Sequence, residues 1–489
     1  MKTYRLSKSK YLSGLQCDKR LWLEIHSPEL IPPTPPTLER IFNQGTYVGE
    51  LARERFPGGI LIDADYENIS EAFDLTKEAL SNGQSIIFEG IFSSDNVLVR
   101  PDVIKQDEND DWELIEVKSS TSVKDENIHD VAVQTYVLKG AGIDVKRTYL
   151  MHINTECVYP DLSNLFTIED ITEQVNEALP AVPGKLDEFR KMLALADHPD
   201  IQIGKHCSSP YGCPFIDHCW AWVPKNSIFT IPRLRWTTKQ KLLEKNQVEI
   251  VKLPPDFPLS DKNQRYRDSV QKRKAIIHWD AIKDELSKLE YPLYFLDFET
   301  DNPAVPRFDG MHPYEQFPFQ YSCHIIDRSG KVTHKGYLQE SERDPGKPLA
   351  KSLTKAIGTK GTVIAYNASF ERWMLRKLAG RFPEYSVALE SIVDRLWDQL
   401  VIFRNYYTDY RFGGSNSLKD VLPVIVPSMS YENLGVRDGG EAQVVWNEMI
   451  RLPYGDDKNK LVKDLKEYCG QDTWAMVEIH NKLVESKES

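Results

Sequence analysis

Residues 97–120 read VLVRPDVIKQDENDDWELIEVKSS, two apolar runs separated by an acidic, turn-forming stretch. Apolar runs bounded by Asp and Asn are typical of strands, so we expect a hairpin here. Asp102 follows the first apolar run, and Glu116 and Lys118 lie two residues apart in the second. Because side chains alternate between the faces of a strand, Glu116 and Lys118 project from one face. The pattern predicts a site for a hard divalent cation, Mg²⁺ or Mn²⁺, with the lysine as a catalytic group. The alternative is a solvated hairpin face with a Glu/Lys ladder.

A second acidic pattern begins with the strand-like run PLYFLDFET at residues 292–300, where Asp297 and Glu299 share one face. The stretch GTVIAYNASFERWML at 361–375 predicts a second strand that leads into a helix carrying Glu371. In the C-terminal helical stretch Tyr468 and Asp472 are four residues apart and therefore share one side. Four carboxylates from one strand and two helices suit a pair of divalent cations, with Tyr468 holding the attacking water.

Cysteines form the third pattern. Cys207, Cys213 and Cys219 lie within KHCSSPYGCPFIDHCW at 205–220, and Cys17 lies in LSKSKYLSGLQCDKRLWLE at 6–24. Four thiolates can converge on one centre, either zinc or an iron–sulfur cluster, and soft thiolates alone do not separate the two. The alternative is a set of buried apolar cysteines.

The first pattern resembles the PD-(D/E)XK nuclease superfamily, with RPD supplying Asp102 and EVK supplying Glu116 and Lys118. GTYVGELARERF at 45–56 is similar to the first helix motif of that superfamily, which implies that Glu50 is a metal ligand. Many members have a histidine where this chain has Gly49. HDVAVQTYVLKGAG at 129–142 resembles the helix that follows the core motif in RecB-like members, and Gln134 matches it as a nucleic-acid contact.

The order of one N-terminal cysteine and three later ones resembles the iron–sulfur RecB-like nucleases, typified by AddB and the CRISPR-associated exonucleases. The resemblance implies a [4Fe-4S] cluster held by Cys17, Cys207, Cys213 and Cys219, with Zn²⁺ as the alternative.

The second pattern resembles the DEDD 3′–5′ exonucleases, which have an RNase H-like fold, in their tyrosine-bearing (DEDDy) branch. DFE, YNASFE and YCGQD match its three motifs, with Glu371 in place of the usual aspartate. The resemblance implies that Asp297, Glu299, Glu371 and Asp472 bind metal and that Tyr468 is catalytic. The chain as a whole resembles a family of predicted RecB-like nucleases in which the two halves are fused.

Between Lys225 and Asp280 the local charge is +7, although the whole chain carries -12. Lys and Arg interleaved with aromatic residues suit a phosphate backbone with stacked bases, although solvated helix faces are often basic too. The candidate nucleic-acid contacts in this segment are Arg235, Arg265, Arg267, Lys272 and Arg273.

The composition narrows the class of protein. A charge of -12 over 489 residues argues against sequence-indifferent binding of nucleic acid by the whole surface. We expect no secretory signal and no membrane segment, and seven cysteines without an export signal favour a cytoplasmic protein.

The sequence therefore predicts an α/β protein with a PD-(D/E)XK restriction-endonuclease-like domain at 1–224, a basic helical linker at 225–289 and an RNase H-like DEDD exonuclease domain at 290–489. The expected function is metal-dependent cleavage of DNA that is single-stranded or has free ends, in repair or defence. The alternatives are an RNA-processing 3′–5′ exonuclease and a nucleic-acid-binding protein whose N-terminal domain is inactive.

Overall fold

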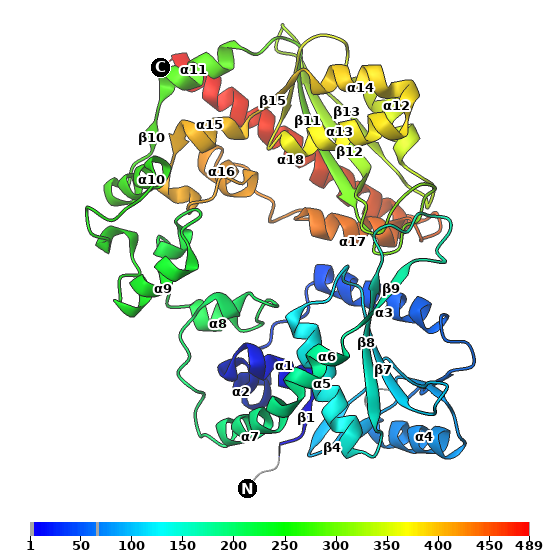
Figure 1. The fold of residues 1–489 in the computed structure, drawn as a ribbon. Coiled ribbons are helices and arrows are strands. Elements are labelled where there is room, and N and C mark those ends of the chain that lie inside the picture. The colour runs from blue at the N-terminus through cyan, green and yellow to red at the C-terminus, as the bar shows by residue number, and fades with distance from the viewer. Residues whose placement is uncertain (1–3, 65–67, 489) are drawn as a thin grey trace. The chain divides into compact units, whose positions relative to one another are not determined.

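The structure, a computed structural model, describes residues 4–64 and 68–488 and divides into two compact units. Unit 1 comprises Met1–Trp222 and Pro303–Glu315, and unit 2 comprises Val223–Asn302 and Gln316–Ser489. Each unit is mixed α/β and contains a mixed sheet of its own (Figure 1). The basic segment at 225–289 lies within unit 2. Within the described ranges, no helix has the length and apolar composition needed to span a membrane.

The main sheet of unit 1 has the strand order β2-β3-β6-β7-β8-β9. Its strands are β2 (Ile60–Leu61), β3 (Ile86–Phe88), β6 (Val103–Gln106), β7 (Trp112–Lys118), β8 (Val145–Ile153) and β9 (Phe166–Asp170). The predicted hairpin is confirmed, because β6 and β7 pair antiparallel with Val103 opposite Ile115. β7 also pairs with β8 in parallel, so the central strand β7 is hydrogen-bonded on both sides.

The first apolar run of the hairpin differs from the expectation, because it is split into two strands. β5 (Val97–Val99) belongs to a separate three-stranded sheet with β1 (Leu6–Ser7) and β4 (Phe92–Ser94). Pro101 has no backbone N–H to donate to a ladder, and the chain changes sheets there. Asp102 therefore immediately precedes β6 instead of following a single long strand.

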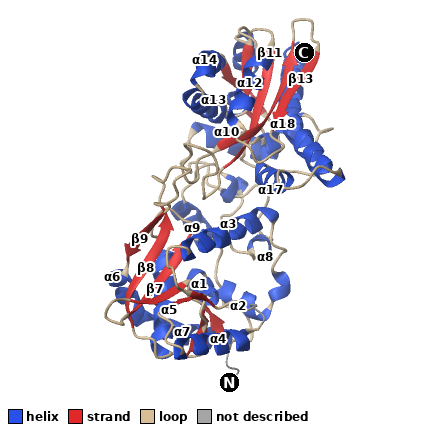
Figure 2. Cartoon of the chain, turned by 90° about the vertical axis from the view of Figure 1, so that its right-hand side faces the viewer, coloured by secondary structure: helices blue, strands red, loops and turns tan. Residues whose placement is uncertain are grey.

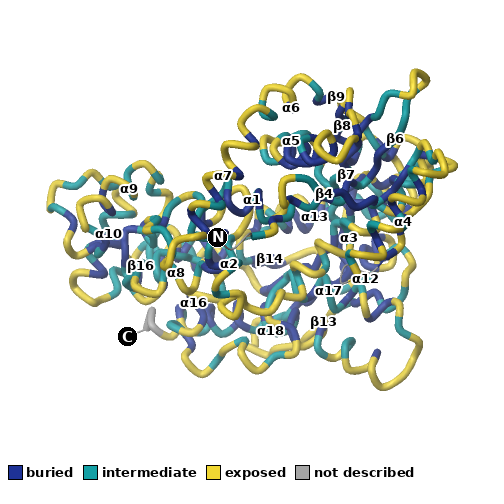
Figure 3. The backbone as a smooth tube through the Cα atoms, turned by 90° about the horizontal axis from the view of Figure 1, so that it is seen from below, coloured by how far each residue is buried: buried dark blue, intermediate teal, exposed yellow. Residues whose placement is uncertain are grey.

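Helices cover both faces of this sheet. α5 (Asp125–Gly140) packs on the face that carries Leu114, and α3 (Pro36–Arg53) packs on the face that carries Ile115. α5 is buried along most of its length, as a helix enclosed on several sides must be (Figure 3). The other helices of unit 1 are α1 (Lys8–Gln16), α2 (Asp18–His26), α4 (Ile69–Ser81), α6 (Thr172–Ala178), α7 (Val182–Leu193) and α8 (Ile216–Trp220).

The main sheet of unit 2 has the order β13-β12-β11-β14-β15. Its strands are β11 (Leu293–Asp301), β12 (Phe317–Ile326), β13 (Val332–Leu338), β14 (Thr362–Ala365) and β15 (Leu396–Asp398). β12 runs antiparallel to β11 and β13, whereas β11, β14 and β15 are parallel. A two-stranded sheet joins β10 (Ile276–Ile277) to β16 (Tyr407–Thr408).

Alternation along β11 separates the two faces of this sheet. Leu296 and Phe298 pack against α12 (Gly346–Ala356), α13 (Ser369–Arg381) and α14 (Ser386–Val393). Phe295 lies on the opposite face and packs against α18 (Asp456–Glu488), the long helix that crosses the sheet (Figure 2). The other helices of unit 2 are α9 (Trp236–Glu244), α10 (Asp261–Lys272), α11 (Trp279–Ser287), α15 (Leu400–Asn405), α16 (Leu418–Ile425) and α17 (Gly439–Met449).

Candidate functional site

The unit 1 carboxylate site consists of Asp102, Glu116 and Lys118, which the sequence predicts to lie together. Glu116 and Lys118 continue the positions of β7 that face α5, after Leu114. The Asp102 Oδ2 atom accepts the backbone N–H of Val117 at 2.6 Å, which fixes this carboxylate beside β7. The structure therefore brings the three predicted residues to one end of one strand.

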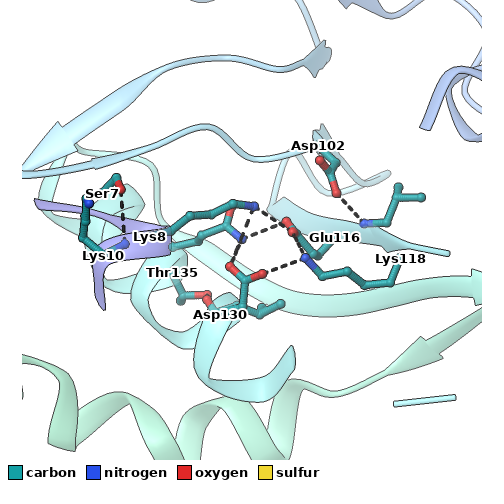
Figure 4. Close-up of polar contacts among 11 residues, drawn as sticks. Ser7, Lys8, Lys10, Asp102, Glu116, Lys118, Asp130 and Thr135 are labelled. Atoms are coloured by element: carbon teal, nitrogen blue, oxygen red, sulfur yellow. Dashed lines mark hydrogen bonds and ion pairs between the residues drawn. The ribbon is translucent and has the colours of Figure 1, made fainter. Parts of the chain in front are cut away.

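Three side chains donate to Glu116. Lys118 Nζ lies 2.6 Å from Glu116 Oε1, and Lys8 Nζ lies 2.7 Å from the same oxygen. Gln134 Nε2 donates to the other oxygen, Oε2, at 2.8 Å. Figure 4 shows both lysines converging on this carboxylate from different elements. Gln134, predicted as a nucleic-acid contact, therefore binds the carboxylate of Glu116 directly.

Asp130, on α5, completes this arrangement. Its Oδ2 atom lies 2.7 Å from Lys118 Nζ, and its Oδ1 atom accepts from Gln134 Nε2 at 3.0 Å and lies 3.7 Å from Lys8 Nζ. The sequence reasoning missed both Asp130 and Lys8. Asp130 precedes Gln134 by one helical turn, so the i, i+4 spacing was a usable signal. Lys8 gave no comparable signal.

The two predicted carboxylates have pKa shifts in opposite directions. Burial, with the nearby charge of Glu116, raises the pKa of Asp102 to about 7. Burial alone would raise the pKa of Glu116, but Lys118 and Lys8 hold it below its ordinary value. Glu116 is therefore an anion at neutral pH, whereas Asp102 is only partly ionised there, and a bound cation would favour its charged form.

These residues fit a divalent cation. Asp102 and Glu116 supply hard oxygen ligands, the type that Mg²⁺ and Mn²⁺ prefer. Gln134 is fully buried, and its Oε1 atom has no hydrogen-bond partner among the described residues. A buried amide oxygen of this kind needs a donor or a hydrated cation.

Glu50 lies apart from this set. α3 packs on the sheet face opposite to α5, where Val48 and Ala52 are buried, and Glu50 is exposed. In the described parts of the chain, no hydrogen bond or ion pair joins Glu50 to Asp102, Glu116 or Lys118. The structure thus gathers the other predicted residues without Glu50.

The cysteine set comprises Cys17, Cys207, Cys213 and Cys219, and all four line one cavity together with Ile203 and Phe215. All four are free thiols. Cys17 stands between α1 and α2, and the Cys213 N–H donates to the Cys207 carbonyl at 3.0 Å. Burial raises the pKa of the Cys17 thiol and raises that of Cys213 to about 11. Cys207 is buried and the other three are half-buried. Thiols that converge from distant segments in this way fit a metal centre, because a bound cation stabilises the thiolates.

The unit 2 carboxylate site consists of Asp297, Glu299, Glu371 and Asp472, which come from β11, the first turn of α13 and α18. Burial raises the pKa of Asp297, and the charges of Asp472, Glu299 and Glu371 raise it further. Burial likewise raises the pKa of Glu371 to about 8 and that of Asp472 to about 6. The charges of the other three predicted carboxylates all act on Asp297, so the four lie in one cluster.

The cluster fits divalent cations. Its charged state is unfavourable without a compensating cation, since carboxylates that share a buried site repel one another. Glu371 is 2% exposed, and its Oε2 atom has no hydrogen-bond partner among the described residues. Oxygen atoms from Asp297 and Glu299 lie within 4.8 Å of each other and of the Cys469 sulfur.

Two aromatic side chains and a lysine adjoin Asp472. Tyr431 donates its hydroxyl to Asp472 Oδ1 at 2.6 Å, and Lys419 Nζ lies 5.7 Å from the ring centre of Tyr431 and 5.8 Å from that of Tyr468. Burial raises the pKa of both tyrosines, so both keep their hydroxyl protons. The sequence predicted Tyr468 but missed Tyr431, Lys419 and Cys469; only Cys469, next to Tyr468, was near a motif.

A cavity of about 530 Å³ opens beside the unit 2 carboxylate site. Asp297, Tyr468 and Asp472 contribute to its wall, and Lys419 and Arg404 add positive charge. Its size falls in the range of roughly 300–1,000 Å³ typical of small-molecule sites.

The predicted nucleic-acid contacts of the basic segment divide into exposed and engaged side chains. Arg235, Lys272 and Arg273 are exposed, and the half-buried Arg265 donates to the Asn405 carbonyl at 3.3 Å. Arg267 is only 6% exposed, and its two Nη atoms donate to the carbonyls of Pro254 and Pro255, each at 2.9 Å. The guanidinium of Arg267 therefore holds the loop that precedes α10.

The fold and these sites define a mixed α/β protein with an acidic site in each of its two units. Residues 294–417, which contain Asp297, Glu299 and Glu371, match the family described as "Domain of unknown function (DUF2779)".

Two curated relatives resemble parts of the chain. Uncharacterized protein MG366 of Mycoplasma genitalium is 26% identical over 242 residues, which cover 45% of this chain and 36% of that protein. Uncharacterized protein UU173 of Ureaplasma parvum serovar 3 is 24% identical over 233 residues, which cover 43% and 34%. The chain thus spans about a third of the length of these relatives. Among solved structures, it is similar to "Crystal structure of SSO0001", with 13% identity, a TM-score of 0.24, and coverage of 46% of this chain and 90% of that one.

Proposed function

We propose that this protein is a metal-dependent nuclease that hydrolyses phosphodiester bonds of DNA, with one site in each unit. The observation that carries the proposal is the unit 2 carboxylate site, where burial raises the pKa of Asp297, Glu371 and Asp472, and the charges of Asp472, Glu299 and Glu371 raise that of Asp297 further. A cluster of like charges is costly to the fold unless cations compensate it, and such clusters mark functional sites.

In unit 2 the proposed activity is 3′–5′ exonucleolytic. The sheet order, three antiparallel strands extended by two parallel ones, supports an RNase H-like fold. Asp297, Glu299, Glu371 and Asp472 would hold the divalent cations, which would activate water and stabilise the leaving oxygen. Tyr468 keeps its proton and lines the adjoining cavity, so its hydroxyl can orient the attacking water. Lys419 and Arg404 offer positive charge to the end of the strand in that cavity.

In unit 1 the proposed site is of the PD-(D/E)XK type. Asp102 and Glu116 would hold Mg²⁺ or Mn²⁺, which would supply a Lewis acid for the phosphodiester. Lys118 is held between Glu116 and Asp130 at 2.6 and 2.7 Å, and these partners raise its pKa against the effect of burial. It is therefore a fixed ammonium that can orient water or offset charge on the phosphate.

We also propose that the cysteine set holds a [4Fe-4S] cluster, with zinc as the alternative. Support comes from the shared cavity of the four free thiols, because thiolates are the ligands that both centres use. A centre bound to Cys17 and to the 207–219 segment would join the two ends of unit 1.

The test is digestion of end-labelled DNA and matched RNA oligonucleotides, single- and double-stranded, in Mg²⁺ or Mn²⁺. We expect a ladder of nucleotides released from the 3′ end and a second product pattern, internal or from the opposite end. Asp297→Ala should abolish the ladder and spare the second pattern, and Lys118→Ala should do the reverse. Glu467→Gln, an exposed change on α18, and Lys139→Ala, an exposed change on α5, are the matched controls.

The outcomes separate the rival functions. Preference for RNA would replace DNA as the substrate. Loss of all cleavage in Asp297→Ala, with no effect of Lys118→Ala, would make unit 1 a binding module. Absence of cleavage of every substrate with either metal would overturn the proposed function.

A further inference from the structure

In the unit 1 carboxylate site the lysine side chains are more exposed than the carboxylates with which they pair. The side chains of Lys8 and Lys118 are 23% and 27% exposed. Glu116 and Asp130, to which both lysines are paired, are only 1% and 4% exposed. Solvent therefore reaches the two lysine side chains more readily than the carboxylates to which they are paired.

Lys8 balances the charge of the buried carboxylates but is not needed to give their oxygens a hydrogen-bond donor. Lys118 already donates to Glu116 Oε1 and Asp130 Oδ2, and Gln134 donates to Glu116 Oε2 and Asp130 Oδ1. Each of the four oxygens thus has a donor without Lys8. The Lys8 ammonium donates to Glu116 Oε1, the same atom that accepts from Lys118.

The local structure does not favour a lysine at this position either. Lys8 is the first residue of α1, and the first turn of α1 contains no acidic residue. A positive charge at a helix N-terminus opposes the helix dipole, and ordering a long side chain costs conformational entropy. Neither helix stability nor hydrogen-bond satisfaction therefore accounts for Lys8, whose structural role is to balance the charge of Glu116 and Asp130.

We propose that Lys8 and Lys118 form a two-lysine anion site that contacts the phosphodiester backbone of a nucleic-acid strand. The proposal rests on the proposed nuclease function and assigns that function a further substrate-binding residue, Lys8. Two ammonium groups that are held by buried carboxylates, on side chains that are partly exposed, suit a phosphate oxygen because their positions are fixed before the strand binds.

Contacts at the C-terminal end of α1 hold this helix, and Lys8 with it, in place. Cys17 of the cysteine set directly follows this helix, and Gln16 Nε2 donates to the carbonyls of His206 and Tyr211 at 2.6 and 2.8 Å. Nine residues at 1.5 Å each make α1 about 14 Å long. One short, rigid helix thus joins the cysteine set to the anion site.

The experiment measures binding apart from cleavage. Anisotropy of a fluorescein-labelled single-stranded DNA oligonucleotide, in Ca²⁺ in place of Mg²⁺, gives the affinity of the full chain over a series of salt concentrations. Each lost phosphate contact lowers the slope of log K against log salt by about 0.7 for a single strand. We expect this loss, with affinity weakened several-fold at low salt, in Lys8→Gln, and wild-type slopes in Lys8→Arg.

The matched control is Lys10→Gln on the same helix. Lys10 Nζ pairs with Glu24 Oε2 at 3.0 Å, so this change perturbs the packing of α1 and spares Glu116. Its slope should equal that of the wild type, because a loss of stability alone does not change the number of phosphate contacts. If Lys8→Gln does not fold, Glu116→Gln and Glu116→Gln/Lys8→Gln give the same comparison without an unbalanced buried carboxylate.

An unchanged slope in folded Lys8→Gln would overturn this inference, and cleavage by the wild type would still leave the nuclease proposal standing. Conversely, a reduced slope together with no cleavage of any substrate would support the anion site and refute the nuclease. Failure of the wild type to bind the oligonucleotide would overturn both.

Discussion

Replacement of Glu371 by glutamine should stabilise the protein at alkaline pH in the absence of metal. Glu371 is 2% exposed, and burial, together with the charge of Asp398, raises its pKa from 4.5 to about 8. The folded state therefore holds this proton more tightly than the unfolded chain does. Consequently the free energy of unfolding falls as pH rises from 4.5 to about 8 and changes little outside that window. Glutamine has nearly the same shape and carries no charge, so it removes this loss.

The size of the effect follows from the shift in pKa. Moving a pKa from 4.5 to about 8 costs up to about 4 kcal/mol of unfolding free energy by pH 8. For a unit of this size that corresponds to a midpoint lower by on the order of 10 °C. Asp297 and Glu299 act in the same direction, since burial raises their pKa values too, so Glu371→Gln should remove part of the wild-type pH dependence.

Thermal unfolding in EDTA at pH 5 and pH 8 checks this expectation. The wild type should lose stability between the two values, and Glu371→Gln should lose clearly less. Glu467→Gln, on the exposed side of α18, should behave as the wild type. If Glu371→Gln loses as much stability as the wild type, burial does not raise the pKa of Glu371 in the folded protein, and Glu371 loses its support as a ligand of a metal site in unit 2.

Three further expectations concern other parts of the molecule. Cys17→Ser should lower the bound iron or zinc, measured by elemental analysis and visible absorbance, and destabilise unit 1; wild-type metal content in this variant would remove Cys17 from the centre. Tyr431→Phe deletes a hydrogen bond that lowers the pKa of Asp472, which is about 6 in the wild type, so this pKa should rise. The acidic limb of the pH–rate profile should therefore move to higher pH, and an unmoved limb would contradict this role. Arg267→Ala should lower the free energy of unfolding in denaturant by roughly 1–3 kcal/mol, because the buried guanidinium loses its hydrogen bonds to the Pro254 and Pro255 carbonyls. Arg273→Ala should weaken DNA binding and leave stability unchanged, and the reverse pattern would be evidence against these roles.

Local periodicity made much of the fold and of both carboxylate sites predictable. The hairpin of β6 and β7 follows from two apolar runs around an acidic turn, and the shared face of Glu116 and Lys118 follows from the two-residue period of a strand. The break at Pro101 was equally local, yet the expected long strand ignored it, and Asp102 therefore occupies a different place in the sheet. Composition alone also misassigned Arg267, because a guanidinium in a basic segment can donate to backbone carbonyls as well as to phosphate.

What could not be predicted depends on contacts between distant residues. Lys8 meets Glu116 across 108 positions of sequence, and only the packing of α1 against α5 and β7 brings them together. Tyr431 reaches Asp472 across 41 positions in the same way. From sequence alone, a lysine at the start of a helix is indistinguishable from an ordinary surface residue. Its role becomes visible only once the buried carboxylates with which it pairs are known. Cys17 directly follows that same helix, α1. Contacts that fix the C-terminal end of α1 therefore also fix the Lys8 ammonium at its N-terminal end.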